Sequence, residues 1–395
     1  MSTILVVNSG SSSFKYQLIE VESEQVLASG LVERIGEESG HARHTTQVGL
    51  WEQELPIADH TAGFGVMLAA FEEHGPSLDA HPLAAVGHRV VHGGKRFHEA
   101  TVVTDLVKIN IEDLSELAPL HNPANLQGID AAQKAFPSVP QVAVFDTAFH
   151  QTLPPAAYTY AIDASLADKQ RVRRYGFHGT SHKFVSGATA EFLGRPLSEL
   201  SMIVLHLGNG ASVCAVQGGK SVETSMGMTP LEGLVMGTRS GDLDPAVLFH
   251  LNRKTGMSFA ELDELLNRRS GLLGLSGHGD MRDVQKAAAA GDAAATLALE
   301  VYLHRIRGYV GNYYAQLGHL DAIVFTAGVG ENNPLVRARS LEGLAEMGIE
   351  VDPALNEVES RSPRFISSPS SRVAVLVVPT NEELEIARQS LEAVS

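Results

Sequence analysis

The sequence contains one cysteine, Cys214, among 395 residues. A single thiol cannot build an intrachain disulfide framework, which fits a reducing compartment. Basic residues are also in the minority, because 30 Lys and Arg stand against 46 Asp and Glu and give a formal net charge of −16. Nucleic acids need a basic binding face, so this balance argues against a nucleic-acid partner. A few local cations together with magnesium can still bind a nucleotide.

Long apolar runs are missing as well. The first seven residues lack the basic n-region and the apolar h-region of a signal peptide, and no stretch is long enough to span a membrane. We therefore expect a cytoplasmic protein with no membrane partner. Apolar residues make up 44% of the chain, which is ample for packed cores, and the length predicts two or three domains.

Two similar hairpins lie about 200 positions apart. Residues 4–7 and 14–20 are predicted strands around a Gly/Ser-rich turn, and residues 202–207 and 211–216 are predicted strands around Gly-Asn-Gly. Aligning Gly10 with Gly210 superposes Ser12 on Ser212. This repetition favours a duplicated domain, although strand-Gly-strand hairpins are common enough to coincide.

Strand patterns alternate with helical patterns along the rest of the chain. Helices are predicted near residues 111–118, 123–135, 245–253, 259–267 and 294–315. The alternation predicts the α/β class with mixed sheets. We expect a domain boundary near residues 147–153 and a C-terminal helix that returns to the first domain.

The two glycine-rich turns can bind phosphate. Residues 8–13 read Asn-Ser-Gly-Ser-Ser-Ser and residues 208–210 read Gly-Asn-Gly. Small residues let the backbone approach phosphate oxygens, and the N–H groups and hydroxyls can donate to them. A plain hairpin turn explains either segment alone. As a pair, one per domain, they predict two phosphate-binding turns that face each other across a cleft.

Two arginines and a histidine lie in glycine-dense segments. Arg89 lies in residues 88–94, His-Arg-Val-Val-His-Gly-Gly, and Arg239 lies in residues 237–240, Gly-Thr-Arg-Ser. A guanidinium group is a planar fork that suits carboxylate or phosphate, although either arginine alone could form a surface ion pair. His178 lies within Gly-Phe-His-Gly-Thr-Ser-His. It is either a ligand-binding residue or a histidine in the turn before a helix.

Two acids follow predicted strands. Asp146 comes after the apolar run 142–145, and Glu382 comes after the run 373–378. Ligands of open α/β sheets bind at the carboxyl ends of strands, although an Asp there more commonly caps the next turn. The segment Thr-Asn-Glu-Glu around Glu382 fits a capping box between its first and last residues. This leaves Glu382 available as a carboxylate for magnesium.

No Cys/His spacing for zinc and no Walker-type Gly-x4-Gly-Lys-Ser/Thr motif occurs in the sequence. A Gly-rich turn begins at Ala327 after the predicted strand 322–325, and its residues 328–332 read Gly-Val-Gly-Glu-Asn. It is interpreted as a nucleoside-binding turn.

Taken in order, these segments resemble the acetate kinase family, of the acetate and sugar kinase, heat-shock and actin superfamily. The resemblance runs nearly end to end and rests on residues 6–13, 88–94, 176–182, 206–210, 237–242, 330–332 and 379–383. It implies two duplicated ribonuclease-H-like domains with an interdomain cleft, and a homodimer. The first domain would span residues 1–150, with a helix at 384–395 returning to it, and the nucleotide-binding domain would span residues 151–383.

The resemblance also implies roles for the matching residues. Arg89 and Arg239 would bind the acid's carboxylate and the transferring phosphoryl group. His178 would hydrogen-bond that group, and Asp146 would orient the acid or a metal-bound water. The metal ligands would be Asn8 and Glu382. The residues at the ATP phosphates would be Ser12, Lys15, His206, Asn209 and Gly210. The adenosine site would comprise Asp280, Met281, Arg282, Gly328, Gly330 and Asn333. The methyl pocket would comprise Val91, Leu120, Phe177 and Pro230.

The implied reaction is reversible, magnesium-dependent phosphoryl transfer from ATP to acetate, with manganese as a substitute metal. Two arginines and the metal would offset the repulsion between a carboxylate and a polyanionic phosphate. The carboxylate is already an anion at pH 7, so no general base is needed and direct in-line transfer is expected. A phosphoenzyme formed on a Glu or His is the alternative mechanism.

Three other functions stay open. The acid could be propionate or another short-chain carboxylate, and pyrophosphate could replace ATP. A non-catalytic nucleotide switch of the same superfamily would need the phosphate turns but not two arginines and a small apolar pocket. The chain departs from the family at Ala327, where many relatives carry Gly, and this bears on the nucleoside turn.

Overall fold

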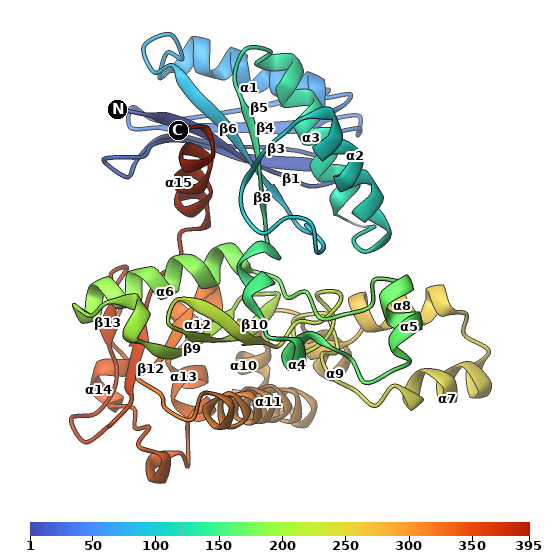
Figure 1. Ribbon diagram of the computed structural model, residues 1–395, viewed down its shortest axis with the longest axis vertical. Helices are drawn as coiled ribbons and strands as arrows, with labels where there is room; N and C mark the ends of the chain where they lie inside the picture. Colours follow the sequence, from blue (N-terminus) through green and yellow to red (C-terminus); the bar gives the residue numbers. More distant parts are fainter. Residues whose placement is uncertain (120) are drawn as a thin grey trace. The chain divides into compact units, whose positions relative to one another are not determined.

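The computed structural model describes residues 1–119 and 121–395. The chain divides into two units, and each has helices packed on a mixed β-sheet (Figure 1). The first unit comprises Met1–Gln151 and Asn381–Ser395, and the second is the continuous stretch Thr152–Thr380. The predicted α/β class with mixed sheets is confirmed.

The sheet of the first unit has eight strands in the order β5-β4-β3-β2-β1-β6-β8-β7. β1, β6 and β8 are parallel neighbours, and the remaining pairs are antiparallel. β1 is rich in aliphatic residues and almost wholly buried, as expected for a central strand covered on both faces. The strands are Thr3–Ser9 (β1), Ser13–Glu20 (β2), Gln25–Glu33 (β3), Gly40–Thr46 (β4), Leu50–Leu55 (β5), Leu83–Val90 (β6), Thr101–Val102 (β7) and Gln141–Phe145 (β8).

Helices cover both faces of this sheet. Val86 shares a hydrophobic core with Phe64 of α1 and Ala132 of α3. Its neighbour Gly87 faces the other side, where α15 approaches so closely that a Cβ would lie 2.4 Å from the Ser390 hydroxyl. The helices are His60–His74 (α1), Asp105–Asp113 (α2), Asn122–Ala135 (α3) and Glu382–Val394 (α15), with short 3-10 helices at Leu114–Glu116 (η1) and Ala148–Thr152 (η2).

The start of α15 corrects one prediction. Asn381 is its N-cap, because the Asn381 side chain accepts a hydrogen bond from the backbone N–H of Leu384 at 3.0 Å. The predicted capping box between Thr380 and Glu383 is therefore wrong. Asn caps helices as well as Ser or Thr does. The Thr380 hydroxyl lies 2.8 Å from the Ser181 hydroxyl instead.

The second unit has a six-stranded sheet in the order β11-β10-β9-β12-β14-β13. β9, β12 and β14 are parallel neighbours, and the other pairs are antiparallel. β9 and β12 are buried at every position, as in a sheet covered on both faces. The strands are Ser201–Leu207 (β9), Ala211–Gln217 (β10), Lys220–Thr224 (β11), Ala322–Thr326 (β12), Arg364–Phe365 (β13) and Ala374–Val377 (β14).

The longest helix of this unit, α11, packs against α9, α10, β9 and β10. None of the helices formed by residues 1–119 and 121–395 is long and apolar enough to cross a membrane. The helices of the unit are Pro155–Tyr158 (α4), Ala164–Lys169 (α5), Gly179–Leu193 (α6), Ala246–Thr255 (α7), Phe259–Arg268 (α8), Gly271–Ser276 (α9), Met281–Ala289 (α10), Ala293–Leu317 (α11), Ala327–Asn332 (α12), Pro334–Ser340 (α13) and Pro353–Asn356 (α14), with 3-10 helices Leu197–Glu199 (η3) and Ala345–Met347 (η4).

The two units share one five-strand pattern. The order β3-β2-β1-β6-β8 has two antiparallel pairs followed by two parallel pairs, and β11-β10-β9-β12-β14 repeats it. The predicted duplication is confirmed. The predicted superposition of Ser12 on Ser212 is wrong, because Ser12 lies in the turn before β2 whereas Ser212 lies within β10, opposite His206.

Candidate functional site

The turn between β9 and β10 is the centre of a polar cluster in the second unit. It consists of Gly208, Asn209 and Gly210, and it is closed by a hydrogen bond from the Gly208 N–H to the Gly210 carbonyl at 3.1 Å. A Cβ at Gly210 would lie 2.7 Å from the Arg239 guanidinium and 3.7 Å from the His178 ring. The structure therefore brings three predicted residues, Gly210, Arg239 and His178, close together.

Arg239 is a half-buried cation at this turn. Its Nη1 donates to the Pro230 carbonyl at 2.7 Å. Among the residues that the structure describes, no carboxylate pairs with it, and burial lowers its pKa from the ordinary value. A desolvated guanidinium without a counter-ion is a strong site for an anion, since a bound phosphate would supply the missing charge.

Two histidine rings stack beside the turn. His178 precedes α6 in a left-handed backbone conformation, with φ of 56°, and its ring lies 4.2 Å from the ring of His206 on β9. A non-glycine residue in this region of φ is uncommon and often marks a functional position. His206 Nδ1 lies 2.8 Å from the Ser181 hydroxyl of α6.

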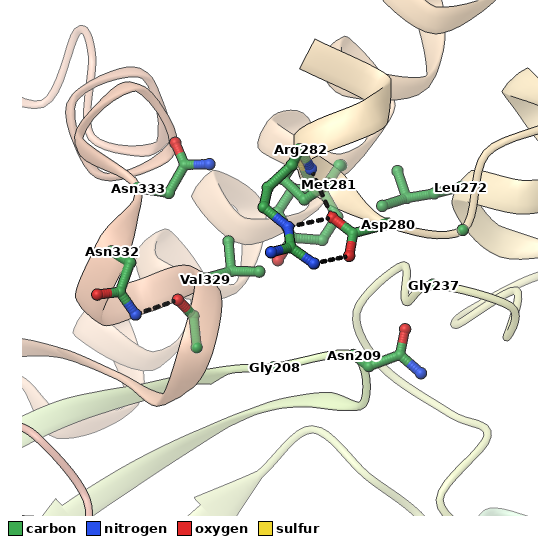
Figure 2. Close-up of a pocket in the computed structure, with 13 residues that line it drawn as sticks. Gly208, Asn209, Gly237, Leu272, Asp280, Met281, Arg282, Val329, Asn332 and Asn333 are labelled. Atoms are coloured by element: carbon green, nitrogen blue, oxygen red, sulfur yellow. Dashed lines mark hydrogen bonds and ion pairs between the residues drawn. The ribbon is translucent and has the colours of Figure 1, made fainter. Parts of the chain in front are cut away.

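A cavity of about 450 Å³ adjoins the same turn (Figure 2). Of the residues predicted at the nucleotide, Asn209, Asp280, Met281, Arg282, Gly328 and Asn333 line it. Gly330 does not line the cavity. It lies in α12 against Phe325, and its carbonyl accepts a hydrogen bond from Arg337 Nη1 at 3.0 Å. Gly208, Val329 and Asn332, which belong to the predicted phosphate and nucleoside turns, line the cavity too. The remaining lining residues were not predicted, and these are Gly237, Leu272, Gly279 and Tyr302.

The walls of the cavity combine apolar side chains with six polar ones, Asn209, Asp280, Arg282, Tyr302, Asn332 and Asn333. Figure 2 shows the Arg282 guanidinium folded back on Asp280, with Nη2 2.6 Å from Oδ2. Hydrogen bonds from Arg282 lower the pKa of Asp280 to about 2. The Tyr302 hydroxyl is buried, and no described residue hydrogen-bonds it. A cavity that combines apolar walls with fixed polar groups is typical of a binding site for a small ligand such as a nucleoside.

Asn333 is held in place by Gln285, a residue that the sequence analysis missed. The two amides exchange hydrogen bonds of 2.9 and 3.0 Å, and Asn333 also caps α13. Gln285 lies inside the helix α10 with no motif around it, so only the packing of α10 against this wall identifies it.

The wall formed by α12 is braced from behind. Glu331 Oε1 accepts hydrogen bonds from the backbone N–H groups of Ala327 at 2.8 Å and Thr380 at 3.1 Å. Ala327, the departure from the family pattern, has a φ of 64°. The fully buried Arg337 donates to the carbonyls of Gly330 and Glu331. These contacts fix the nucleoside turn to the body of the second unit.

In the first unit, Arg89 and Asp146 form a bidentate ion pair. Arg89 Nε lies 2.9 Å from Asp146 Oδ1, and Nη2 lies 2.8 Å from Oδ2. Asp146 is buried, and its charge is the main cause of the raised pKa of Arg89, with smaller contributions from Glu382 and Glu383. Asp146 thus engages the edge of the guanidinium formed by Nε and Nη2.

The predicted metal ligands lie in the first unit too. Asn8 and Lys15 line a small cavity of about 190 Å³ together with Glu383. Glu382 Oε2 is buried and no described residue hydrogen-bonds it. Burial raises the pKa of Glu382 to about 7. Ser12 is exposed in the turn before β2.

The predicted methyl pocket is placed only in part. Val91 follows β6, and its N–H donates to the Asn125 side chain at 3.1 Å. Phe177 is buried next to His178, and Pro230 is held by Arg239. Leu120 lies outside the described residues. The pocket therefore stays a prediction.

Comparison with known proteins gives the family. The model of the acetokinase family matches residues 3–388. The chain belongs to the acetokinase family. It is 71% identical over 393 residues to the acetate kinase of Clavibacter michiganensis subsp. michiganensis (strain NCPPB 382), covering 100% of this chain and 99% of that relative.

Solved structures of acetokinase relatives agree with the fold along the whole chain. The acetate kinase of Porphyromonas gingivalis has a TM-score of 0.96 at 43% identity, covering 100% of both chains. A propionate kinase from Francisella tularensis subsp. tularensis SCHU S4 has a TM-score of 0.93, also at 43% identity, covering 99% of this chain and 100% of that one.

Proposed function

We propose that this acetokinase-family protein is an acetate kinase that transfers a phosphoryl group reversibly between ATP and acetate. The observation that carries the proposal is the cluster of Arg239, His178 and the glycine turn beside a cavity of about 450 Å³. In this arrangement a desolvated cation, hydrogen-bond donors and a cavity large enough for a nucleoside lie together within one unit. A nucleotide switch would use the cavity and the turn but has no need of the desolvated Arg239.

ATP is the donor that the cavity favours over pyrophosphate. Pyrophosphate would need the turn and Arg239 but would leave the hollow lined by Leu272, Met281 and Val329 without a ligand. A nucleoside would fill it and would bury the apolar walls, which is the main driving force for binding in such pockets.

Each cation has a separate task in the proposed reaction. An acetate oxygen forms a bond to the γ-phosphorus, and the bond from that phosphorus to the bridging oxygen of ADP breaks. Arg239 and His178 donate hydrogen bonds to the transferring group, whose charge spreads over its equatorial oxygens. Arg89, oriented by Asp146, binds the carboxylate of the acid. Acetate is an anion at neutral pH, so no residue has to remove a proton and transfer is direct.

The first unit fits a magnesium ion with few protein ligands. The buried, unsatisfied Oε2 of Glu382 is the type of group that a cation would satisfy, and Asn8 offers an amide oxygen. No group of three or more His, Cys, Asp or Glu that could hold a metal occurs in residues 1–119 and 121–395. This suits magnesium, which keeps waters and binds substrate phosphates, and which when bound would neutralise phosphate charge.

Propionate is the second candidate acid, because the propionate kinase from Francisella tularensis resembles this chain as closely in identity as the acetate kinase structure does. An apolar pocket separates acids that differ by one methylene by roughly 10- to 200-fold. We therefore expect propionate to be a measurable but poorer substrate than acetate, as judged by kcat/KM.

The test is the formation of an acyl phosphate, trapped as a hydroxamate. Purified protein is incubated with ATP, magnesium and acetate, propionate or butyrate, and each reaction is repeated in excess chelator. We expect product with acetate first, and none with chelator. Two results would contradict the proposal. One is that product forms equally well in chelator, and the other is that no product forms with any of the three acids. Higher kcat/KM for propionate would make the protein a propionate kinase.

The homodimer and the cytoplasmic location implied by the family resemblance stay predictions. Light scattering coupled to size-exclusion chromatography measures the first directly, and a monomer at micromolar concentration would contradict it.

A further inference from the structure

Ser212 lies between two histidines that the proposed reaction treats differently. It is the second residue of β10 and is fully buried. Its hydroxyl oxygen lies 2.9 Å from Nδ1 of His178 and 2.8 Å from Nε2 of His182. His182 is fully buried on α6, one turn after His178, and its N–H donates to the His178 carbonyl at 2.9 Å. Nothing in the assigned chemistry uses Ser212 or His182.

The hydroxyl has one proton, so it can donate to only one of the two rings. If it donates to His178 Nδ1, that nitrogen carries no proton, and His182 Nε2 must carry one and donate to the Ser212 oxygen. If it donates to His182 Nε2, then His178 Nδ1 carries a proton and donates to Ser212. Whenever the hydroxyl donates to one of the two rings, the tautomers of the rings are therefore coupled through one oxygen.

Only the first arrangement gives a neutral His178 that donates from Nε2. The contact with Ser212 occupies Nδ1, so a hydrogen bond to a phosphoryl group has to come from the other nitrogen. In the second arrangement a neutral His178 would present a lone pair at Nε2 and would repel a phosphate oxygen. The choice of tautomer thus decides whether the ring attracts or repels the transferring group.

We propose that Ser212 and His182 are positioning residues that hold His178 in the tautomer protonated at Nε2. The inference rests on the proposed function both for the role of His178 and for the choice between the two tautomers. The frame is rigid, because β10 fixes Ser212 opposite His206 and the first turn of α6 fixes both histidines. The left-handed backbone of His178 turns its ring onto this frame.

The first test reads the tautomer without any reaction. Ring nitrogens are observed by NMR in protein labelled with 15N-histidine, and His178 is assigned by comparison with the His178→Gln variant. We expect the proton on Nε2 in the unmodified protein, and a mixture of tautomers in Ser212→Ala. A proton on Nδ1 in the unmodified protein, or an unchanged tautomer in Ser212→Ala, would overturn the inference. Neither result depends on whether acetate is a substrate.

The second test reads kcat and the KM for ATP. We expect Ser212→Ala and His182→Leu each to lower kcat by about tenfold or more, with little change in KM, since the contact matters most in the transition state. His182→Gln keeps an N–H donor near the position of Nε2 and should recover most of the loss. The matched control is Ser340→Ala, which removes another fully buried hydroxyl, one bonded to the Val336 carbonyl.

These variants separate positioning from packing. If Ser212→Ala and Ser340→Ala lose similar thermal stability and only the first loses kcat, the positioning role is supported. A normal kcat in a Ser212→Ala protein whose tautomer has changed would overturn it. If the unmodified protein makes no acyl phosphate, the proposed function fails, and the NMR result still decides the tautomer.

Discussion

Arg89 and Arg239 were both predicted from glycine-dense segments, but they differ in their surroundings. Arg89 is neutralised by a bidentate contact with Asp146, whereas Arg239 meets only the Pro230 carbonyl among its described partners. A paired arginine keeps its orientation when the substrate is absent. An unpaired, desolvated one gains more from a polyanion. This difference supports the separate roles proposed for the acid and for the phosphoryl group.

Replacing Arg239 by lysine keeps the charge and removes the planar fork. We expect Arg239→Lys to lower kcat by ~10²-fold or more, the loss typical of a preorganised donor to the transition state. Steady-state kinetics with acetate and ATP measure it, with circular dichroism to confirm folding. Arg195→Lys is the control, because Arg195 forms an exposed ion pair with Asp321 in the same unit. Similar turnover in both variants would remove Arg239 from the reaction.

Ala327 sits in a backbone conformation that favours glycine. With a φ of 64°, its Cβ costs roughly 1 kcal/mol, which the greater chain entropy of unfolded glycine partly offsets. We expect Ala327→Gly to change the free energy of unfolding by between 0 and about 1 kcal/mol, in the stabilising direction.

The matched control for this change is Ala298→Gly, in the interior of α11, which should destabilise by about 1 kcal/mol. Urea denaturation gives both values. An equal loss of stability in the two variants would show that the positive φ carries no strain.

At the scale of elements, α15 illustrates what a sequence pattern leaves open. Thr380 and Glu383 match a capping box, and only the structure shows that Asn381 is the N-cap. Thr380 and Asn381 are both residues that can cap a helix. The Thr380 hydroxyl instead lies 2.8 Å from the Ser181 hydroxyl, 199 positions away in the chain, a contact that no local pattern can predict.

The carboxylate of Glu382, at the start of α15, lowers the stability of the folded protein when no cation is bound. The buried Oε2 of Glu382 lacks a hydrogen bond from the described residues, so its charge opposes folding when no cation is bound. In excess chelator we expect Glu382→Gln to raise the melting temperature, by an amount equivalent to about 1 kcal/mol. The variant should also lose the stabilisation that magnesium and ATP give the unmodified protein.

Glu392→Gln is the control for this prediction, because Glu392 is an exposed acid on the same helix. Scanning fluorimetry with and without chelator reads both effects. A lower melting temperature for Glu382→Gln in chelator, or an undiminished response to magnesium and ATP, would contradict the proposed ligand.

At the scale of the whole molecule, the cavity proposed to bind the nucleoside is lined by residues of the second unit alone. We expect ATP alone to slow amide hydrogen exchange most in segments 208–210, 279–282 and 328–333, since these line the cavity or its turn. Mass spectrometry of peptides from the full chain measures it, with acetate alone as the control. Protection confined to segments of the first unit would contradict the placement of the nucleotide.

The sequence predicted the duplicated sheets and most of the cavity, and it failed where contacts are distant. Asn209 and Gly328 lie in glycine-rich turns that follow predicted strands, so the pattern indicated them, whereas Asp280 was assigned only by the family resemblance. Leu272 and Tyr302 are ordinary apolar or aromatic residues of α9 and α11. They become wall residues only because these helices pack together, and no local signal separates them from the core.

The route of the chain between the units has a consequence for synthesis on the ribosome. The first unit is interrupted after Gln151 and regains its last helix only at Asn381–Ser395, whereas the second unit is continuous. Until α15 is translated, Gly87 and the sheet face around it lack their covering helix. The second unit can complete its native contacts first. During this time the sheet of the first unit, although it is made earlier, keeps one face exposed to water. Nascent chains would therefore aggregate most readily, and bind chaperones most readily, just before Asn381–Ser395 emerge from the ribosome.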